Sequence, residues 1–208
     1  MNHSKTIHLS LVALVLILTS SCAKIFESPD ARTLAGNHKI FAVIPPKISI
    51  AAGRKIDAES LKEQQKTESI NFQNEMYSWL LKRKMQGSIN QEIQEIETTN
   101  AKLKKAGYPE TPLTPGEICA LLEVDGIMTS NFSLNKPMSD GAAVAAMVLL
   151  GGSGATNQVT ISLSITDCQN KKLIWNYSHK LSGGLGSSPA KIVDQLMRAS
   201  TKKMPYRI

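Results

Sequence analysis

The residues that could act in catalysis are few in this chain of 208 residues, and they stand far apart. Ser188 and Lys191 have the Ser-x-x-Lys spacing found in penicillin-recognising enzymes, which use a serine nucleophile. The Ser-Asp-Asn and Lys-Thr-Gly segments that complete such a site are absent from the sequence. His38 and His179 have no cluster of cysteines or carboxylates at ligand spacing beside them. The sequence therefore predicts no catalytic residue, no metal site and no cofactor.

Two glycine-rich segments are weak candidates for binding an anion. Residues 151–154 read Gly-Gly-Ser-Gly, but the Gly-Lys-Ser/Thr that completes a phosphate-binding loop does not follow. Residues 183–186 precede a predicted helix, whose first amides could face an anion. A simple glycine-rich connection is the interpretation that we favour for both segments.

Cys22 carries the clearest chemical signal in the sequence. A short polar start with Lys5 precedes an apolar run from Leu9 to Leu18, and Thr-Ser-Ser then leads to Cys22. The apolar run has the length of a secretory signal and is too short to span a bilayer. A cysteine directly after small residues resembles the bacterial lipoprotein signal, in which the thiol receives a diacylglycerol and becomes the new N-terminus.

This signal predicts where the protein resides. We expect residues 1–21 to be removed and the lipid on Cys22 to anchor the chain, since two or more acyl chains hold a protein stably on a membrane. By the same resemblance, Ala23 in place of an aspartate favours the periplasmic side of the outer membrane. An ordinary secreted protein and an uncleaved anchor are the alternatives.

The charge balance indicates either an anionic partner or a solvated basic surface. The formal net charge is +7 at pH 7. Because a periplasmic location argues against nucleic acid, an anionic lipid or a cell-wall polymer is the electrostatic partner that we favour. The length suits one domain with a substantial core. We expect residues 22–37 to form a lipidated tether and residues 38–208 to form the periplasmic domain.

Cys119 and Cys168 are the cysteines that remain after Cys22. In an oxidising periplasm they can pair, provided that the strands near them are antiparallel neighbours. The alternative is two buried thiols that act as small apolar side chains.

Hydrophobic patterning in the first half of the chain predicts strands alternating with helices. The apolar run at residues 39–46 predicts a buried strand, followed by a loop at 48–53. Residues 57–86 predict a long helix with an aromatic and methionine face turned to the core. Residues 88–107 fit either a helix or, as we favour, a strand followed by a short helix capped within residues 98–100.

Two helix starts in the second half carry specific capping signals. Thr114-Pro-Gly-Glu117 is a capping box that predicts a helix, and residues 125–134 after it predict a strand. A final helix is predicted to begin at Pro189, with Ser188 as its cap.

Residues 159–181 predict a β-hairpin. Apolar and polar residues alternate on both sides of a polar turn at 167–171, as in strands with one buried face. On the returning strand this alternation places Leu173, Trp175 and Tyr177 on the buried face.

An apolar insertion at residues 139–157 separates the predicted strand at 125–134 from the hairpin. Its central part, 141–154, carries no charge and is rich in small residues, but it is too short for a membrane span. One alternative is a helix that is buried or covers a sheet edge. The second is an element that contacts lipid or a neighbouring subunit. In the second case the contact residues are Ala146, Met147, Val148, Leu149 and Leu150.

Several segments together resemble a group of envelope lipoproteins. They are the strand ending Ala42-Val-Ile-Pro45, the helix-to-strand passage at 121–127, and the hairpin around Trp175 with the helix that follows it. The group includes the periplasmic domain of the curli-secretion lipoprotein CsgG and the penicillin-binding-protein activator LpoB. The resemblance spans roughly residues 39–203 and implies a compact α/β domain that works through protein contacts.

The sequence as a whole predicts a single α/β (α+β) domain, with a mixed sheet of about five strands, packed helices and a C-terminal helix. The expected function is that of a non-enzymatic subunit or accessory of a cell-envelope assembly or secretion complex. The expected partners are the membrane, through the lipid, other envelope proteins and further copies of the chain. The alternatives are a binding module for a cell-wall polymer or anionic lipid and, less favoured, a hydrolase.

Overall fold

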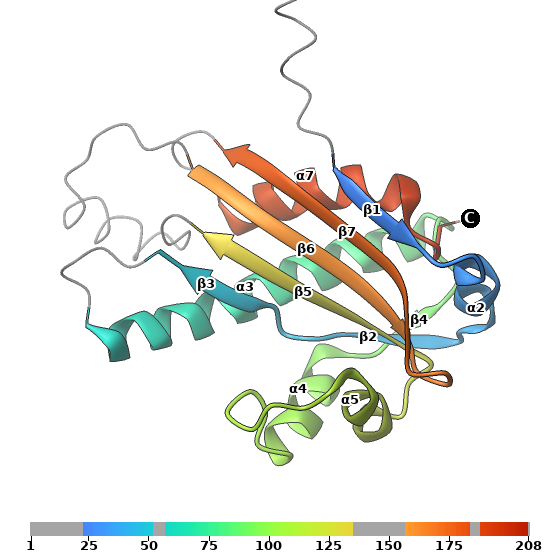
Figure 1. The fold of residues 1–208 in the computed structure, drawn as a ribbon, viewed down its shortest axis with the longest axis horizontal. Helices are drawn as coiled ribbons and strands as arrows, with labels where there is room; N and C mark the ends of the chain where they lie inside the picture. The colour runs from blue at the N-terminus through green and yellow to red at the C-terminus, as the bar shows by residue number, and fades with distance from the viewer. Residues whose placement is uncertain (1–22, 52–56, 135–156, 184–187, 208) are drawn as a thin grey trace, which may run out of the picture.

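The computed structural model describes residues 23–51, 57–134, 157–183 and 188–207. Helices pack on a mixed sheet of seven strands in the order β1-β7-β6-β5-β2-β4, with β3 beside β5 (Figure 1). This is the predicted single α/β domain.

No helix in these ranges has the length and apolar character needed to cross a membrane. The elements are β1 Lys24–Glu27, α2 Ala31–Asn37, β2 Ile40–Val43, β3 Lys47–Ile50, α3 Ala58–Met85, β4 Glu92–Ile93, α4 Ile96–Lys105, α5 Pro115–Leu122, β5 Gly126–Leu134, β6 Asn157–Asp167, β7 Lys172–Gly183, α7 Pro189–Ser200 and the 3₁₀ turn η1 Thr201–Lys203.

The antiparallel run β5-β6-β7 forms the centre of the sheet. It confirms the predicted hairpin, and the apolar positions of β6 are buried on one face because successive strand residues point to opposite sides. β2 and β3 pair with β5 in parallel, and β4 pairs with β2 in parallel. The sheet is therefore mixed, as predicted.

The helices α3 and α7 cover one face of the sheet and lie behind it in Figure 1. Asp57 caps α3 by accepting hydrogen bonds from the backbone N–H groups of Glu59 and Ser60. Gly87 follows this helix with a φ of +68°, a conformation that favours glycine. Ser188 caps α7 as predicted.

A second, smaller core lies on the opposite face, under α4 and α5. Ala42 and Ile127 point into it, whereas their neighbours Phe41 and Met128 point into the larger core. The predicted capping box starts α5: the Thr114 hydroxyl oxygen accepts from the Glu117 N–H, and the Glu117 carboxylate accepts from the Thr114 N–H at 2.7 Å.

The tether predicted at residues 22–37 is wrong from Lys24 onward. β1 pairs antiparallel with β7, and α2 buries Ala31 and Ala35 completely. A four-residue strand has too little pattern of its own to be recognised, and its partner strand lies near the other end of the chain. The folded domain therefore begins two residues after Cys22.

The loop predicted at residues 48–53 is also wrong in its first part. β3 continues beyond the two prolines and pairs with the end of β5. Ile48 and Ile50 are buried while Lys47 and Ser49 are exposed, which is the alternation of an ordinary strand. The prolines break the strand locally without ending the sheet.

Residues 88–107 form a shorter strand than predicted. β4 has two residues, and Ile89 adds a single bridge to Arg207. The helix that follows begins at Ile96 with Glu95 at its N-cap, before the predicted cap at residues 98–100.

The returning strand of the hairpin contains a register shift that the alternation did not predict. Ile165 lies opposite Trp175, but the next residue of β6, Thr166, lies opposite Leu173, so Ile174 is an extra residue. Trp175 and Tyr177 are buried as predicted, whereas Leu173 is 42% exposed and Ile174 takes a buried place.

Candidate functional site

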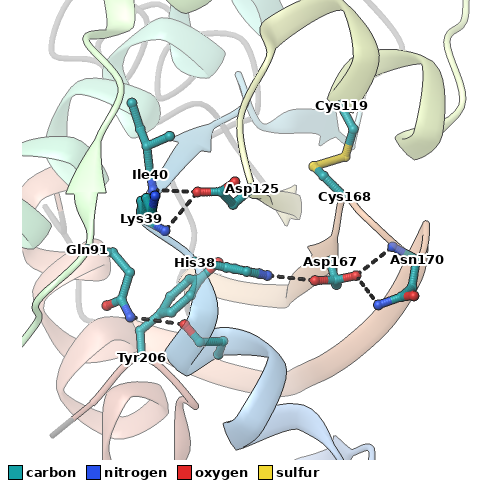
Figure 2. A network of polar contacts seen from close by, with 11 residues as sticks. His38, Lys39, Ile40, Gln91, Cys119, Asp125, Asp167, Cys168, Asn170 and Tyr206 are labelled. Carbon is teal, nitrogen blue, oxygen red and sulfur yellow. Dashed lines mark hydrogen bonds and ion pairs between the residues drawn. A yellow bond between two sulfur atoms is a disulfide. The ribbon is translucent and has the colours of Figure 1, made fainter.

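A buried polar cluster joins His38, Asp167 and Tyr206 (Figure 2). The His38 Nε2 lies 2.7 Å from Asp167 Oδ1, and the His38 Nδ1 lies 2.7 Å from the Tyr206 Oη. All three residues are buried, with exposed fractions of 6%, 2% and 2%. An aspartate, a histidine and a tyrosine in series are also the groups that a proton-transfer site would use.

Three distant segments position this cluster. His38 directly follows α2, Asp167 is the last residue of β6, and Tyr206 follows η1 near the end of the chain. Gly126, the first residue of β5, lies under the His38–Tyr206 contact. A Cβ at Gly126 would lie 2.3 Å from the Tyr206 Oη and 2.6 Å from the His38 Nδ1, so the contact requires glycine there.

Hydrogen bonds from the hairpin turn hold the other side of the Asp167 carboxylate. The backbone N–H and side-chain amide of Asn170 donate to Asp167 Oδ2 at 2.7 and 2.9 Å. Nearby, Asp125 Oδ2 accepts from the backbone N–H groups of Lys39 and Ile40, at 2.7 and 3.0 Å (Figure 2). One carboxylate thus ties the start of β2 to the residue before β5, and the other ties His38 to the end of β6.

The surroundings shift the pKa values of two members of the cluster. Burial raises the pKa of the Asp167 carboxyl, but the hydrogen bonds from His38 and Asn170 outweigh burial, so the pKa lies below its ordinary value. Burial, with the nearby charges of Asp167 and Asp125, holds the pKa of Tyr206 well above its ordinary value. At neutral pH the cluster therefore holds a carboxylate and a neutral phenol.

Both imidazole nitrogens of His38 have a partner within the cluster. With a neutral imidazole, one tautomer lets Nε2–H donate to Asp167 while Nδ1 accepts from the Tyr206 hydroxyl. Both nitrogens are then engaged inside the protein. The cluster links three chain segments, and His38 and Tyr206 also line a pocket of about 350 Å³.

Cys119 of α5 and Cys168, just after β6, form a disulfide beside the cluster (Figure 2). Their Cα atoms lie 5.3 Å apart, and the bridge closes a separation of 49 residues. Of the two alternatives that the sequence left open, the structure contains the paired form.

The remaining candidate residues are not brought together. Ser188 Oγ accepts from the Lys191 N–H at 3.4 Å as a helix cap, which is a structural role for the Ser-x-x-Lys pair. Gly183 ends β7, and residues 184–187 lie outside the described ranges, as do Cys22, the segment 151–154 and the five predicted contact residues at 146–150. Within the described ranges no group of three or more His, Cys, Asp or Glu residues is arranged to hold a metal ion.

A groove on another part of the surface is rich in basic residues. It has a volume of about 650 Å³ and lies between the C-terminal half of α3 and the segment formed by α7, η1 and the residues after it. Its lining consists of Trp79, Arg83, Ser88, Ile89, Arg198, Thr201, Lys202, Lys203, Met204 and Arg207. Five of these ten residues are cations, and none is acidic.

The sequence analysis predicted neither the buried polar cluster nor the basic groove. Asp167 and Tyr206 are 129 and 168 positions from His38, and the groove combines residues 79–89 with residues 198–207. The runs Lys82-Arg83-Lys84 and Lys202-Lys203 are the local hints of a basic site, because charges cluster there.

The fold and the internal cluster define a single-domain α/β protein with a polar link at one end of its sheet. No protein-family model matches the sequence, and no curated protein matches it. Among solved structures, lipoprotein GNA1162 from Neisseria meningitidis is similar at 12% identity, covering 79% of this chain and 95% of that chain, with a TM-score of 0.47. A PelC dodecamer from Paraburkholderia phytofirmans is similar at 12% identity, covering 90% and 100%, with a TM-score of 0.43.

The C-terminal domain of LpoB from Salmonella enterica is similar at 11% identity, covering 74% of this chain and 95% of that chain, with a TM-score of 0.34. LpoB is in the group that the sequence resembles. The resemblance to that group, CsgG included, stays a prediction.

Proposed function

We propose that this protein is a lipid-anchored envelope protein, held on the periplasmic side of the outer membrane, that serves as a non-enzymatic subunit or accessory of an assembly or secretion complex. The observation that carries the proposal is the junction between Cys22 and the domain. Cys22 follows a secretory-type apolar run, and β1 begins at Lys24. Since a strand rises about 3.3 Å per residue, a lipid on Cys22 would hold β1 against the membrane surface.

The exposed character of β1 supports a contact role at that surface. Among the described residues β1 pairs with β7 alone, so its outer edge carries unpaired backbone groups. Ile25 and Phe26 are 42% and 50% exposed, although both are large apolar side chains. An exposed strand edge with apolar side chains is a typical docking surface for a protein partner.

The apolar insertion adds a second candidate contact. It leaves the sheet after Leu134 and returns at Asn157, and Leu134 lies opposite Val159 in the antiparallel pair. The insertion therefore starts and ends at one end of the sheet. We propose that Ala146 to Leu150 contact the membrane or a neighbouring subunit, including a second copy of the chain.

The internal cluster supports a non-enzymatic role. The groups of His38, Asp167 and Tyr206 that could transfer a proton are bonded to one another and buried. The protein would then act through its surfaces, as the envelope resemblance implies.

The anchor is tested by replacing its thiol. We expect Cys22→Ser to accumulate as a larger precursor that takes up no palmitate analogue, whereas the wild-type protein is labelled and fractionates with the outer membrane. Crosslinking in intact envelopes, followed by purification of the wild-type protein, should then recover other envelope proteins. Equal label on both proteins would reject lipidation at Cys22.

A binding module for an anionic lipid or a cell-wall polymer is the second candidate function. The observation that favours it is the groove lined by five basic residues. A steep loss of binding with added salt would distinguish it from a mainly apolar protein contact, because salt screens exposed charges.

A further inference from the structure

We infer that the basic groove between α3 and α7 is a binding site for a phosphate-bearing ligand whose uncharged part lies against Trp79. The inference rests on the second candidate function and names its ligand chemistry and its residues. It needs neither the lipid on Cys22 nor an assembled complex.

The charge of the groove exceeds what its own surroundings neutralise. Arg198 pairs with Asp194 at 2.7 Å, but no ion pair links Lys202, Lys203 or Arg207 to any residue in the described ranges. Like charges that converge on a concave surface focus the electrostatic potential and attract anions.

The stabilisation of helix C-termini explains only some of the basic side chains in the groove. Basic side chains commonly stabilise the C-terminus of a helix, and both α3 and α7 end at this groove. Each helix end supplies about half a negative charge. Two such ends and Asp194 leave most of the five cations of the groove uncompensated.

The groove also has an apolar wall beside the cations. Trp79, Ile89 and Met204 line it, and the Arg83 guanidinium lies over the Trp79 ring, 4.5 Å from its centroid. The Trp79 Nε1–H donates to Asp194 at 3.3 Å, which fixes the orientation of the indole. A ligand with both an anionic group and an uncharged portion matches this surface.

The wall and the cations are held in place by the fold. Ile89 forms a β-bridge to Arg207, and the Met204 N–H donates to the Thr201 carbonyl at 3.3 Å. Met204 and Ile89 are buried, so the segment that carries Lys202, Lys203 and Arg207 is anchored on both sides. Such a prearranged site loses less entropy when it binds a ligand.

Phosphate is the anion that the donor set favours. Arginine presents a planar fork of N–H donors that matches a phosphate, and lysine adds a compact positive charge. A volume of about 650 Å³ exceeds what one phosphate needs and accommodates a glycerol-phosphate or sugar-phosphate group. The same chemistry occurs in a phospholipid headgroup and in a soluble phosphate ester.

The test titrates the full chain, purified in a nonionic detergent, with inorganic phosphate, glycerol phosphate, short-chain phosphatidylglycerol and short-chain phosphatidylcholine. Calorimetry and tryptophan fluorescence report binding. Because Trp175 is completely buried, a ligand-induced fluorescence change would come from Trp79. The groove variant is Lys202→Glu with Lys203→Glu, and the matched control is Lys104→Glu with Lys105→Glu. The control changes the net charge equally at exposed positions in the last turn of α4.

We expect saturable binding of phosphatidylglycerol or glycerol phosphate, competition by inorganic phosphate, and no binding of phosphatidylcholine. The groove variant should bind roughly tenfold or more weakly than the control variant. Stronger binding of the lipid would assign the site to a headgroup, and equal binding of glycerol phosphate would assign it to a soluble ester.

Three results would overturn the inference. The first is the absence of saturable binding in all four titrations, and the second is equal weakening in both variants, which would indicate unspecific attraction. Thermal unfolding of both variants verifies that they are folded, and a fluorescence change retained in a Trp79→Phe variant would also place the ligand elsewhere. Equal palmitate label on the wild type and on Cys22→Ser, or no label on the wild type, would reject the anchor without affecting this result.

Discussion

At the scale of single residues, the main feature is the internal link formed by His38, Asp167 and Tyr206. It satisfies buried polar groups from three chain segments, and a buried polar group without a partner would cost about 1–3 kcal/mol. Gly126 makes the link sterically possible because it leaves room for two side chains above β5. The cluster therefore stabilises the end of the sheet where β2, β5 and β6 meet.

Gly126→Ala should destabilise the protein by about 1–3 kcal/mol, the usual cost of overpacking, because the new Cβ would overlap the Tyr206 hydroxyl and the His38 ring. Urea unfolding followed by circular dichroism measures the change. Gly36→Ala is the matched control, since a Cβ there meets no atom within 4 Å. The control should be unchanged or up to about 1 kcal/mol more stable, as expected for a glycine in a helix. Similar midpoints for both variants would contradict the close contact.

The Asp167 carboxyl should make stability depend on acidic pH. Its pKa in the folded protein lies below the unfolded value of about 3.9, so its stabilisation is complete above that value and is lost as the pH falls through the folded pKa. Asp167→Asn removes this titration. The stability advantage of the wild-type protein over the variant should therefore shrink as the pH falls below about 5 in a series of urea unfolding curves. An advantage that is constant with pH would rule out a shifted carboxyl.

At the scale of elements, the β6-β7 hairpin determines how the helices pack. Its register shift at Ile165 and Thr166 turns Trp175 and Tyr177 inward and leaves Leu173 partly in solvent. The turn of the hairpin carries Cys168, whose disulfide joins the hairpin to α5. The bulge and the turn thus each affect a different layer of helices.

Trp175→Ala should cost roughly 3–5 kcal/mol in unfolding free energy, because it empties a completely buried aromatic site. Leu173→Ala, two positions away and 42% exposed, should cost about 1 kcal/mol or less. Denaturant midpoints of the two variants measure the difference. If the leucine variant proved the less stable of the two, the register shift would be in another place.

Removing the disulfide should lower stability by about 2–4 kcal/mol. The bridge closes a separation of 49 residues and restricts the unfolded chain, which is the main source of disulfide stabilisation in the chain-entropy account. The double substitution Cys119→Ala with Cys168→Ala, compared with the oxidised wild type by thermal unfolding, measures the effect. A reductant should destabilise the wild type and leave the double variant unchanged, and equal sensitivity of both would argue against the pair.

At the scale of the whole molecule, the surfaces proposed for function lie at different places on one domain. β1 forms one edge of the sheet beside Cys22, and the insertion leaves from the end of β5. The basic groove lies on the helical side, between α3 and α7. Because these places are separate, the proposed membrane contact, partner contact and anionic ligand would not compete for one surface.

Val148→Asp should disrupt assembly while the domain stays folded, if residues 146–150 form the proposed contact. An unpaired charge is costly to bury in an apolar interface, but it is tolerated when the surface faces water. Size-exclusion chromatography and circular dichroism separate the outcomes. Loss of both fold and assembly would identify the segment as core, and a folded variant that assembles normally would reject both interpretations.

The sequence by itself determined the features whose signals are local. The capping box at Thr114 and Glu117, the helix at α3 with Gly87 after it, and the alternation of the hairpin all arise from neighbouring residues. Each depends on backbone conformation, on a cap or on a period of two or 3.6 residues, which a short stretch of sequence contains completely.

Only the tertiary structure decided the features that combine distant segments. β1 acquires its identity by pairing with β7, the His38 link joins residues up to 168 positions apart, and the groove gathers cations from α3 and from the last residues of the domain. The register shift belongs to this class too, because the packing of Trp175 against the helices selects which residue is extra. The physical reason is that these contacts are set by which surfaces the folded chain brings together, and no local period encodes that choice.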